Sequence, residues 1–184
     1  MIKNIKVTTI HEQESAYKDW LEKISKPDDA ASFFDRVVRK ESWYDEMKEC
    51  MIVLILDTKH KLLAWNLVSL GQVDMSIASP REVFRPALAF AAEEKAPEDG
   101  KMTDHATRET YRLAVMGAAT TILLMHNHPA GGTTPSKQDI DLTKKMVKAG
   151  EILGIHLLDH VVMGRDDNFY SMRSGGEVNF SYNK

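Results

Sequence analysis

The chain has few cysteines and little net charge, and each shortage excludes a class of protein. Cys50 is the only cysteine, so an internal disulfide and a zinc site built from several thiolates are both excluded. The 24 basic and 27 acidic residues give a formal net charge of −3 at pH 7. Whole-chain electrostatic binding of nucleic acid is therefore not supported by the charge, although a local basic patch is compatible with it.

Long apolar runs are also missing. No run approaches the length that crosses a membrane, and the first residues lack the apolar stretch of a signal peptide. Together with the single cysteine, this predicts a cytoplasmic protein without a membrane partner. The 184 residues, 43% of them hydrophobic, suit one domain with a sizeable core.

Two histidines follow a short apolar run in the middle of the chain. Residues 122–125 read Ile-Leu-Leu-Met and predict a buried strand, which continues into His126 and His128. Side chains alternate along a strand, so these two imidazoles point to the same side and Asn127 to the other. Two neutral imidazoles on one side can reach one ion at about 2.0–2.1 Å.

A turn and a helix start come directly after the histidines. Gly131 and Gly132 permit a sharp return, and Pro135 with Ser136 is typical of a helix N-terminus, which places Asp139 in the first turn. Ser136 and Asp139 could be a helix-capping pair, and the histidines could be polar groups at a strand end. The combination of all these residues around one tight loop favours a metal site with an open position for water.

This pattern resembles a known family. His-x-His, seven residues and then Ser-x-x-Asp is the signature of the JAMM (JAB/MPN) metallo-isopeptidases, and HNHPAGGTTPS is similar to the RadC-like branch. Further similar stretches lie at residues 79–84 and 153–160, and the resemblance covers residues 27–173. It implies a three-layer α/β fold with a mixed sheet between helices, the JAB/MPN or cytidine-deaminase-like fold.

The resemblance also implies roles for individual residues. His126, His128 and Asp139 would bind Zn²⁺, and Ser136 would donate a hydrogen bond to the developing oxyanion or the bound water. A glutamate near the start of a strand acts as general acid/base in the family, and Glu49 takes that place here. From the sequence alone, Glu49 could instead be one more surface acid, and Glu46 is its nearest rival.

The implied function is that of a zinc-dependent hydrolase that cleaves a peptide or isopeptide bond in a protein or peptide substrate. Two alternatives stay open. One is a RadC-like factor associated with DNA repair, and the other is a non-catalytic binding module on the same fold. The binding module would be favoured if Glu49 lay far from the metal.

His160 lies in a predicted strand over residues 156–163. A histidine in a strand is more often a structural group with satisfied hydrogen bonds. The functional alternative is a partner in the second coordination shell that orients a metal ligand.

The remaining expectations concern boundaries. Residues 1–26 are predicted as an N-terminal extension, 27–173 as the metal domain, 91–114 as an insertion, and 174–184 as a loose C-terminal tail. Strands are predicted at 51–56, 62–70, 71–77 and 169–171, and helices from Pro27, from Pro80, over 103–116 and from Ser136. Gly150 is predicted to end the last of these helices.

Overall fold

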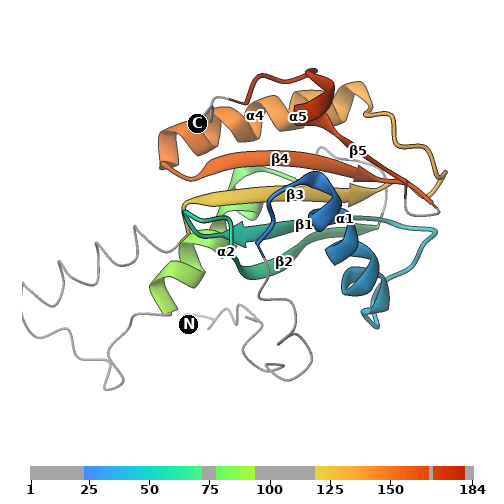
Figure 1. The fold of residues 1–184 in the computed structure, drawn as a ribbon, viewed down its shortest axis with the longest axis horizontal. Coiled ribbons are helices and arrows are strands. Elements are labelled where there is room, and N and C mark those ends of the chain that lie inside the picture. Colours follow the sequence, from blue (N-terminus) through green and yellow to red (C-terminus); the bar gives the residue numbers. More distant parts are fainter. Residues whose placement is uncertain (1–22, 72–77, 94–118, 166–167, 181–184) are drawn as a thin grey trace, which may run out of the picture.

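One mixed sheet forms the centre of the molecule (Figure 1). The computed structural model describes residues 23–71, 78–93, 119–165 and 168–180, and the strands in these ranges have the order β2-β1-β3-β4-β5. β1 is antiparallel to β2 and β3, β3 is parallel to β4, and β5 is antiparallel to β4. The strands are β1 (Glu49–Leu56), β2 (Leu62–Gly71), β3 (Thr121–Asn127), β4 (His156–Met163) and β5 (Phe169–Ser171).

Helices cover both faces of this sheet and complete three layers. α1 (Pro27–Arg36) lies on one face, where its apolar side chains pack against Ile52, Leu54 and Leu56 of β1. α2 (Pro80–Glu93) and α4 (Lys137–Leu153) lie on the opposite face, against the alternate β1 residues Met51, Val53 and Ile55. β1 is buried along its whole length because both of its faces are covered.

Most predicted elements within the described ranges are confirmed. Strands β1, β2, β4 and β5 and the helices that begin at Pro27 and Pro80 agree with the sequence pattern. The predicted strand at 71–77, the predicted helix at 103–116 and the N-terminal extension as far as residue 22 lie outside the described residues. Among the described helices, none is both long and apolar enough to cross a membrane.

The predicted end of α4 is wrong by one turn. α4 continues past Gly150 to Leu153, and Gly154 at φ +70° is the residue that ends it. A Cβ on Gly150 would lie 2.4 Å from the backbone oxygen of Ile155, so this glycine makes room for the chain that enters β4. Gly150 therefore serves packing, and only Gly154 has the left-handed conformation of a helix C-terminus.

The segment predicted as a loose tail packs against the domain as far as the structure describes it. After the short helix α5 (Met172–Gly175), Val178 and Phe180 are buried and join the core on the α2 and α4 face. These two apolar side chains are separated by one residue, which is enough to anchor an extended segment. The polar and glycine-rich residues around them hid this pattern in the sequence.

Candidate metal centre

His126 and His128 stand at the end of β3 on the face that α4 covers. Leu124 precedes them on this face and belongs to the core with α4, which confirms the predicted alternation along the strand. His126 is fully buried, whereas the side chain of His128 is 22% exposed. One imidazole is thus fixed by the core, and the other lies at the edge of a cavity.

Asp139 reaches the same point from the first turn of α4. The backbone N–H of Ser136 donates to Asp139 Oδ2 over 2.6 Å, and the N–H of Asp139 donates to Ser136 Oγ over 3.2 Å. This is a capping box, so the helix-capping interpretation of Ser136 and Asp139 is correct. It does not exclude a metal site, because the same hydrogen bonds hold the Asp139 carboxylate against the two imidazoles.

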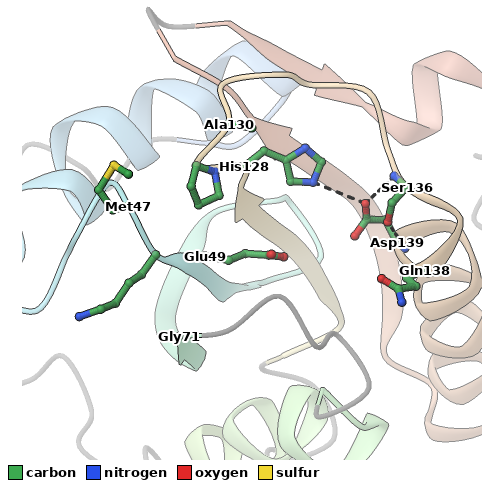
Figure 2. A pocket seen from close by; sticks show the side chains of 10 residues that line it. Met47, Glu49, Gly71, His128, Ala130, Ser136, Gln138 and Asp139 are labelled. Carbon is green, nitrogen blue, oxygen red and sulfur yellow. Dashed lines mark hydrogen bonds and ion pairs between the residues drawn. The ribbon is translucent and has the colours of Figure 1, made fainter.

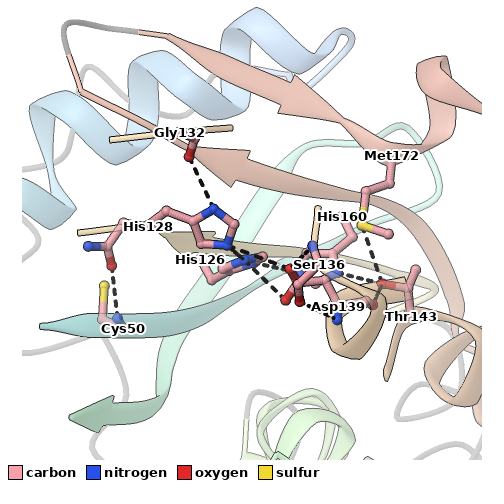
Figure 3. Close-up of polar contacts among 10 residues, drawn as sticks. Cys50, His126, His128, Gly132, Ser136, Asp139, Thr143, His160 and Met172 are labelled. Carbon is pink, nitrogen blue, oxygen red and sulfur yellow. Dashed lines mark hydrogen bonds and ion pairs between the residues drawn. The ribbon is translucent and has the colours of Figure 1, made fainter. Parts of the chain in front are cut away.

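The three side chains converge closely enough to hold one metal ion (Figure 3). His126 Nε2 lies 3.0 Å from His128 Nε2, His126 Nε2 lies 3.3 Å from Asp139 Oδ1, and His128 Nε2 lies 3.6 Å from Asp139 Oδ2. Ligands bound tetrahedrally at about 2.0–2.1 Å are about 3.3–3.4 Å apart. The two imidazole–carboxylate distances run to different oxygens of Asp139, so this carboxylate has an oxygen close to each imidazole. With one ligand atom from each residue, the three atoms lie within 4.8 Å of one another, which is close enough to hold one ion.

The hydrogen bonds on the outer side of the imidazoles show which nitrogens face the centre. His128 Nδ1 lies 3.1 Å from the backbone oxygen of Gly132, which can only accept, so Nδ1 carries a proton and Nε2 is the nitrogen that faces the centre. His126 Nδ1 is engaged by His160 Nε2 at 2.8 Å, which leaves Nε2 toward the centre. Two lone pairs and a carboxylate repel one another at these distances unless a cation lies between them. The donor set therefore fits a divalent metal.

The pKa shifts describe the same arrangement. Burial and the neighbouring His160 lower the pKa of His126 well below its usual value. The hydrogen bond to Asp139 raises the pKa of His128, so a proton can occupy the centre when no metal does. Burial acts to raise the pKa of Asp139, but its interactions with His128, His126 and Ser136 outweigh this and keep it ionised.

Glu49 lies in the same pocket as His128 and Asp139 (Figure 2). Met51 of β1 pairs with His126, so the continued antiparallel register brings Glu49 level with His128 on the same face. Burial raises the pKa of the Glu49 carboxyl, and the negative charge of Asp139 adds to this effect, whereas His128 opposes it. Glu46, the rival considered from the sequence, is exposed and does not line this pocket.

The pocket has a volume of about 560 Å³ and an apolar lip. Met47, which is 68% exposed, Gly71, Pro129 and Ala130 line it beside the polar groups Ser136 and Gln138. A cavity of this size accommodates an extended peptide segment or a side chain of several carbons. Ser136 faces the pocket, so its hydroxyl proton is available to a bound group while its oxygen accepts from Asp139 N–H.

The sequence predicted the direction of the Asn127 side chain but not the hydrogen bonds that it makes. Its side chain lies on the opposite face from the histidines, where Oδ1 accepts from Cys50 N–H over 2.8 Å and Nδ2 donates to the Lys48 oxygen over 3.0 Å. These two backbone groups flank Glu49, so Asn127 fixes the start of β1 to the end of β3. In the sequence, the position of Asn127 between His126 and His128 was a feature that could have indicated this supporting role.

His160 lies beside His126, as a role in orienting that ligand requires. Its other neighbour, Thr143, was not identified from the sequence. His160 is fully buried with its two ring nitrogens near His126 and Thr143. Burial lowers its pKa to about 4, so it is neutral at pH 7. The hydroxyl of Thr143 lies 2.6 Å from His160 Nδ1, a contact between α4 and β4 that nothing in the local sequence around residue 143 indicates. Cys50, by contrast, is no candidate ligand, because it is buried in the core on the α1 face of the sheet, away from the metal centre.

Comparisons with known proteins agree with this geometry. A family model described as the RadC-like JAB domain matches residues 24–95 and 98–177, and omits only 96–97 within that span, inside the predicted insertion. A UPF0758 protein of Desulforamulus reducens is 35% identical over 75% of this chain and 48% of its own length. UPF0758 proteins of Methanosarcina mazei and Geotalea uraniireducens are 33% and 34% identical, each over 85% of this chain and 54% of their own length.

The chain thus spans about half the length of the curated relatives that it matches. The mixed sheet of five strands in the described ranges, with helices on both faces, is the architecture expected of a JAB/MPN-like fold. The matched residues include the whole His126, His128 and Asp139 group. The chain therefore belongs to the RadC-like JAB domain family.

Proposed function

We propose that the chain is a zinc-dependent hydrolase of the JAMM type that cleaves a peptide or isopeptide bond with water. One observation carries this proposal. Two imidazole nitrogens and a carboxylate oxygen converge within 4.8 Å of one another, and a buried carboxylate, Glu49, lies in the adjoining pocket. Two imidazoles and one carboxylate favour zinc or iron over the harder divalent ions.

Glu49 acts as general acid/base in this mechanism. When bound, the metal supplies a Lewis acid that lowers the pKa of a coordinated water to about 7. The Glu49 carboxylate accepts a proton from the attacking water as its oxygen bonds to the substrate carbonyl carbon. Glu49 then returns the proton to the amine nitrogen as the C–N bond breaks, and a raised pKa suits both transfers.

Ser136 stabilises the charge on the carbonyl oxygen. Its hydroxyl accepts from Asp139 N–H and keeps its own proton for donation into the pocket. A donor held in place before the reaction acts on the oxyanion without reorganisation. The backbone turn that holds Ser136 is the N-terminus of α4, whose partial positive charge acts in the same direction.

The position of Glu49 also bears on the alternatives. A non-catalytic binding module has no use for a buried carboxylate beside the metal ligands, whereas a hydrolase requires one. A DNA-repair factor remains compatible with the family, but no contact in the described residues favours it.

Hydrolysis tests the proposal directly. The zinc-loaded protein is incubated with two probe sets, linear peptides and peptides branched through a lysine side chain, and new amines are quantified by a fluorogenic reagent and mass spectrometry. We expect amine release that a chelator abolishes and that added zinc restores. Release that persists unchanged in the chelated protein, or no release from any probe in either set, would contradict the proposed activity.

Replacing Ser136 separates its two roles. Ser136→Ala is expected to lower kcat by about 10²–10³-fold through loss of the oxyanion donor, and to destabilise the fold by about 1 kcal/mol through loss of the helix cap. Ser136→Gly is the matched variant, because a glycine at this position costs only a few tenths of a kcal/mol, roughly, in capping. Kinetics and thermal denaturation of both variants check this. Near-normal turnover in Ser136→Gly would remove Ser136 from the mechanism.

A further inference from the structure

A chain of buried hydrogen bonds runs behind His126 and returns to Asp139 (Figure 3). His126 Nδ1 lies 2.8 Å from His160 Nε2, and His160 Nδ1 lies 2.6 Å from Thr143 Oγ1. Thr143 Oγ1 in turn lies 2.6 Å from the backbone oxygen of Asp139. The three linking side chains are fully buried, so water does not compete for these bonds.

The end of this chain fixes the direction of every bond in it. A backbone carbonyl can only accept, so the Thr143 hydroxyl donates to Asp139, and its oxygen accepts from Nδ1–H of His160. Nε2 of His160 then has the lone pair and accepts from Nδ1–H of His126. The sulfur of Met172, 3.5 Å from the Thr143 hydroxyl, is a much weaker acceptor and does not change this order.

A bulge in β4 directs His160 toward the site. Ile122 pairs with Leu157 and Leu124 pairs with His160, so three steps along β4 match two along β3. In a regular strand Asp159 would occupy the position that His160 holds. The extra residue moves His160 onto the face of the metal centre, an arrangement that is common beside functional sites.

The side chain of Asp159 holds this bulge in place. Its Oδ1 accepts from the N–H groups of His160 and Arg173, at 2.7 and 3.0 Å, and its Oδ2 accepts from Ser171 Oγ at 2.5 Å. Asp159 is therefore structural, although it is adjacent to His160 in the sequence.

We propose that Thr143 and His160 are positioning residues that set the tautomer of His126, so that its Nε2 lone pair faces the metal before any metal binds. This chain of hydrogen bonds begins at the backbone oxygen of Asp139 and ends at the imidazole ring of His126. A shift of α4 relative to β3 therefore disturbs both candidate ligands together. This inference rests on the proposed metal centre, but the tautomer itself exists without metal. Groups in this position commonly contribute about 10–100-fold to metal affinity.

Two measurements test the proposal. The first is a long-range ¹H–¹⁵N NMR spectrum of metal-free protein at neutral pH, with His126 assigned by substitution. We expect the Nδ1–H tautomer in the wild type and a mixture of tautomers in Thr143→Val, which keeps the shape of the side chain and removes the hydroxyl. A wild-type His126 protonated on Nε2 would overturn the proposal.

The second measurement is the Kd for zinc alone, by competition with a chromophoric chelator. We expect Thr143→Val to bind zinc about 10–100-fold more weakly than the wild type, and Thr143→Ser, which keeps the hydroxyl, to bind within a few-fold. Val161→Ala removes buried volume from β4 on the α1 face and controls for general destabilisation. Equal Kd values for Thr143→Val and wild type would refute the positioning role while leaving the metal centre intact. A wild type that binds no zinc would refute the metal centre, and the NMR spectrum would still decide the tautomer.

Discussion

Glu49→Gln is expected to lower kcat by about 10²–10⁴-fold while leaving zinc binding unchanged. The carboxylate of Glu49 lies in the pocket with His128 and Asp139, but it is not one of the three converging ligands. Glutamine has nearly the same shape and cannot accept the proton of the attacking water. Turnover is measured by amine release, and the zinc content of the same samples by elemental analysis.

The matched control is Glu46→Gln, three residues earlier. Glu46 has the same charge and is exposed outside the pocket, so its replacement is expected to change kcat less than two-fold or so. A similar loss of kcat in both variants would show that turnover depends on the negative charge near the pocket and does not require a base at residue 49. Loss of zinc from Glu49→Gln would place Glu49 among the ligands.

His126→Ala is expected to abolish stoichiometric zinc binding. His126 is the only one of the three ligand residues that is 0% exposed, and its replacement removes a donor atom together with the link to His160. The loss of affinity should therefore exceed the about 10–100-fold cost of losing a supporting hydrogen bond alone. Elemental analysis and a zinc competition titration measure this effect, and circular dichroism checks that the variant is folded.

His60→Asn provides the control for losing an imidazole elsewhere. His60 lies in the turn between β1 and β2 at φ +61°, a conformation that asparagine tolerates, and it lines a different cavity from the metal centre. This variant should retain one zinc per chain. A folded His126→Ala protein with stoichiometric zinc would show that the ligand assignment is wrong.

Local periodicity was sufficient to predict that His126, His128 and Asp139 converge. Alternation along a strand puts His126 and His128 on one face whatever the rest of the chain does, and the capping box fixes Asp139 within a few residues of Ser136. These interactions act over short distances in the sequence. That is why the residues that converge at the centre, and most helices and strands in the described ranges, could be predicted.

Other features depend on contacts between distant segments. The choice between Glu46 and Glu49 requires the pairing of β1 with β3, because only that register shows which carboxylate is level with His128. Gly150 and Gly154 are equally plausible helix ends until the approach of Ile155 is known. The bulge in β4 breaks the period of two, so the orientation of His160 could not be derived by counting along the strand.

The attachment of β1 to β3 through Asn127 has an evolutionary consequence. Its side chain holds Lys48 and Cys50, so the backbone on both sides of residue 49 is fixed without any help from the side chain of Glu49. The ligand group is assembled from β3 and α4 and has its own hydrogen bonds. If the chain is the zinc hydrolase proposed above, a single codon change at residue 49 is expected to abolish turnover and to leave the fold and the metal site intact. On that proposal, one substitution separates an active hydrolase from a pseudoenzyme in this fold, in either direction.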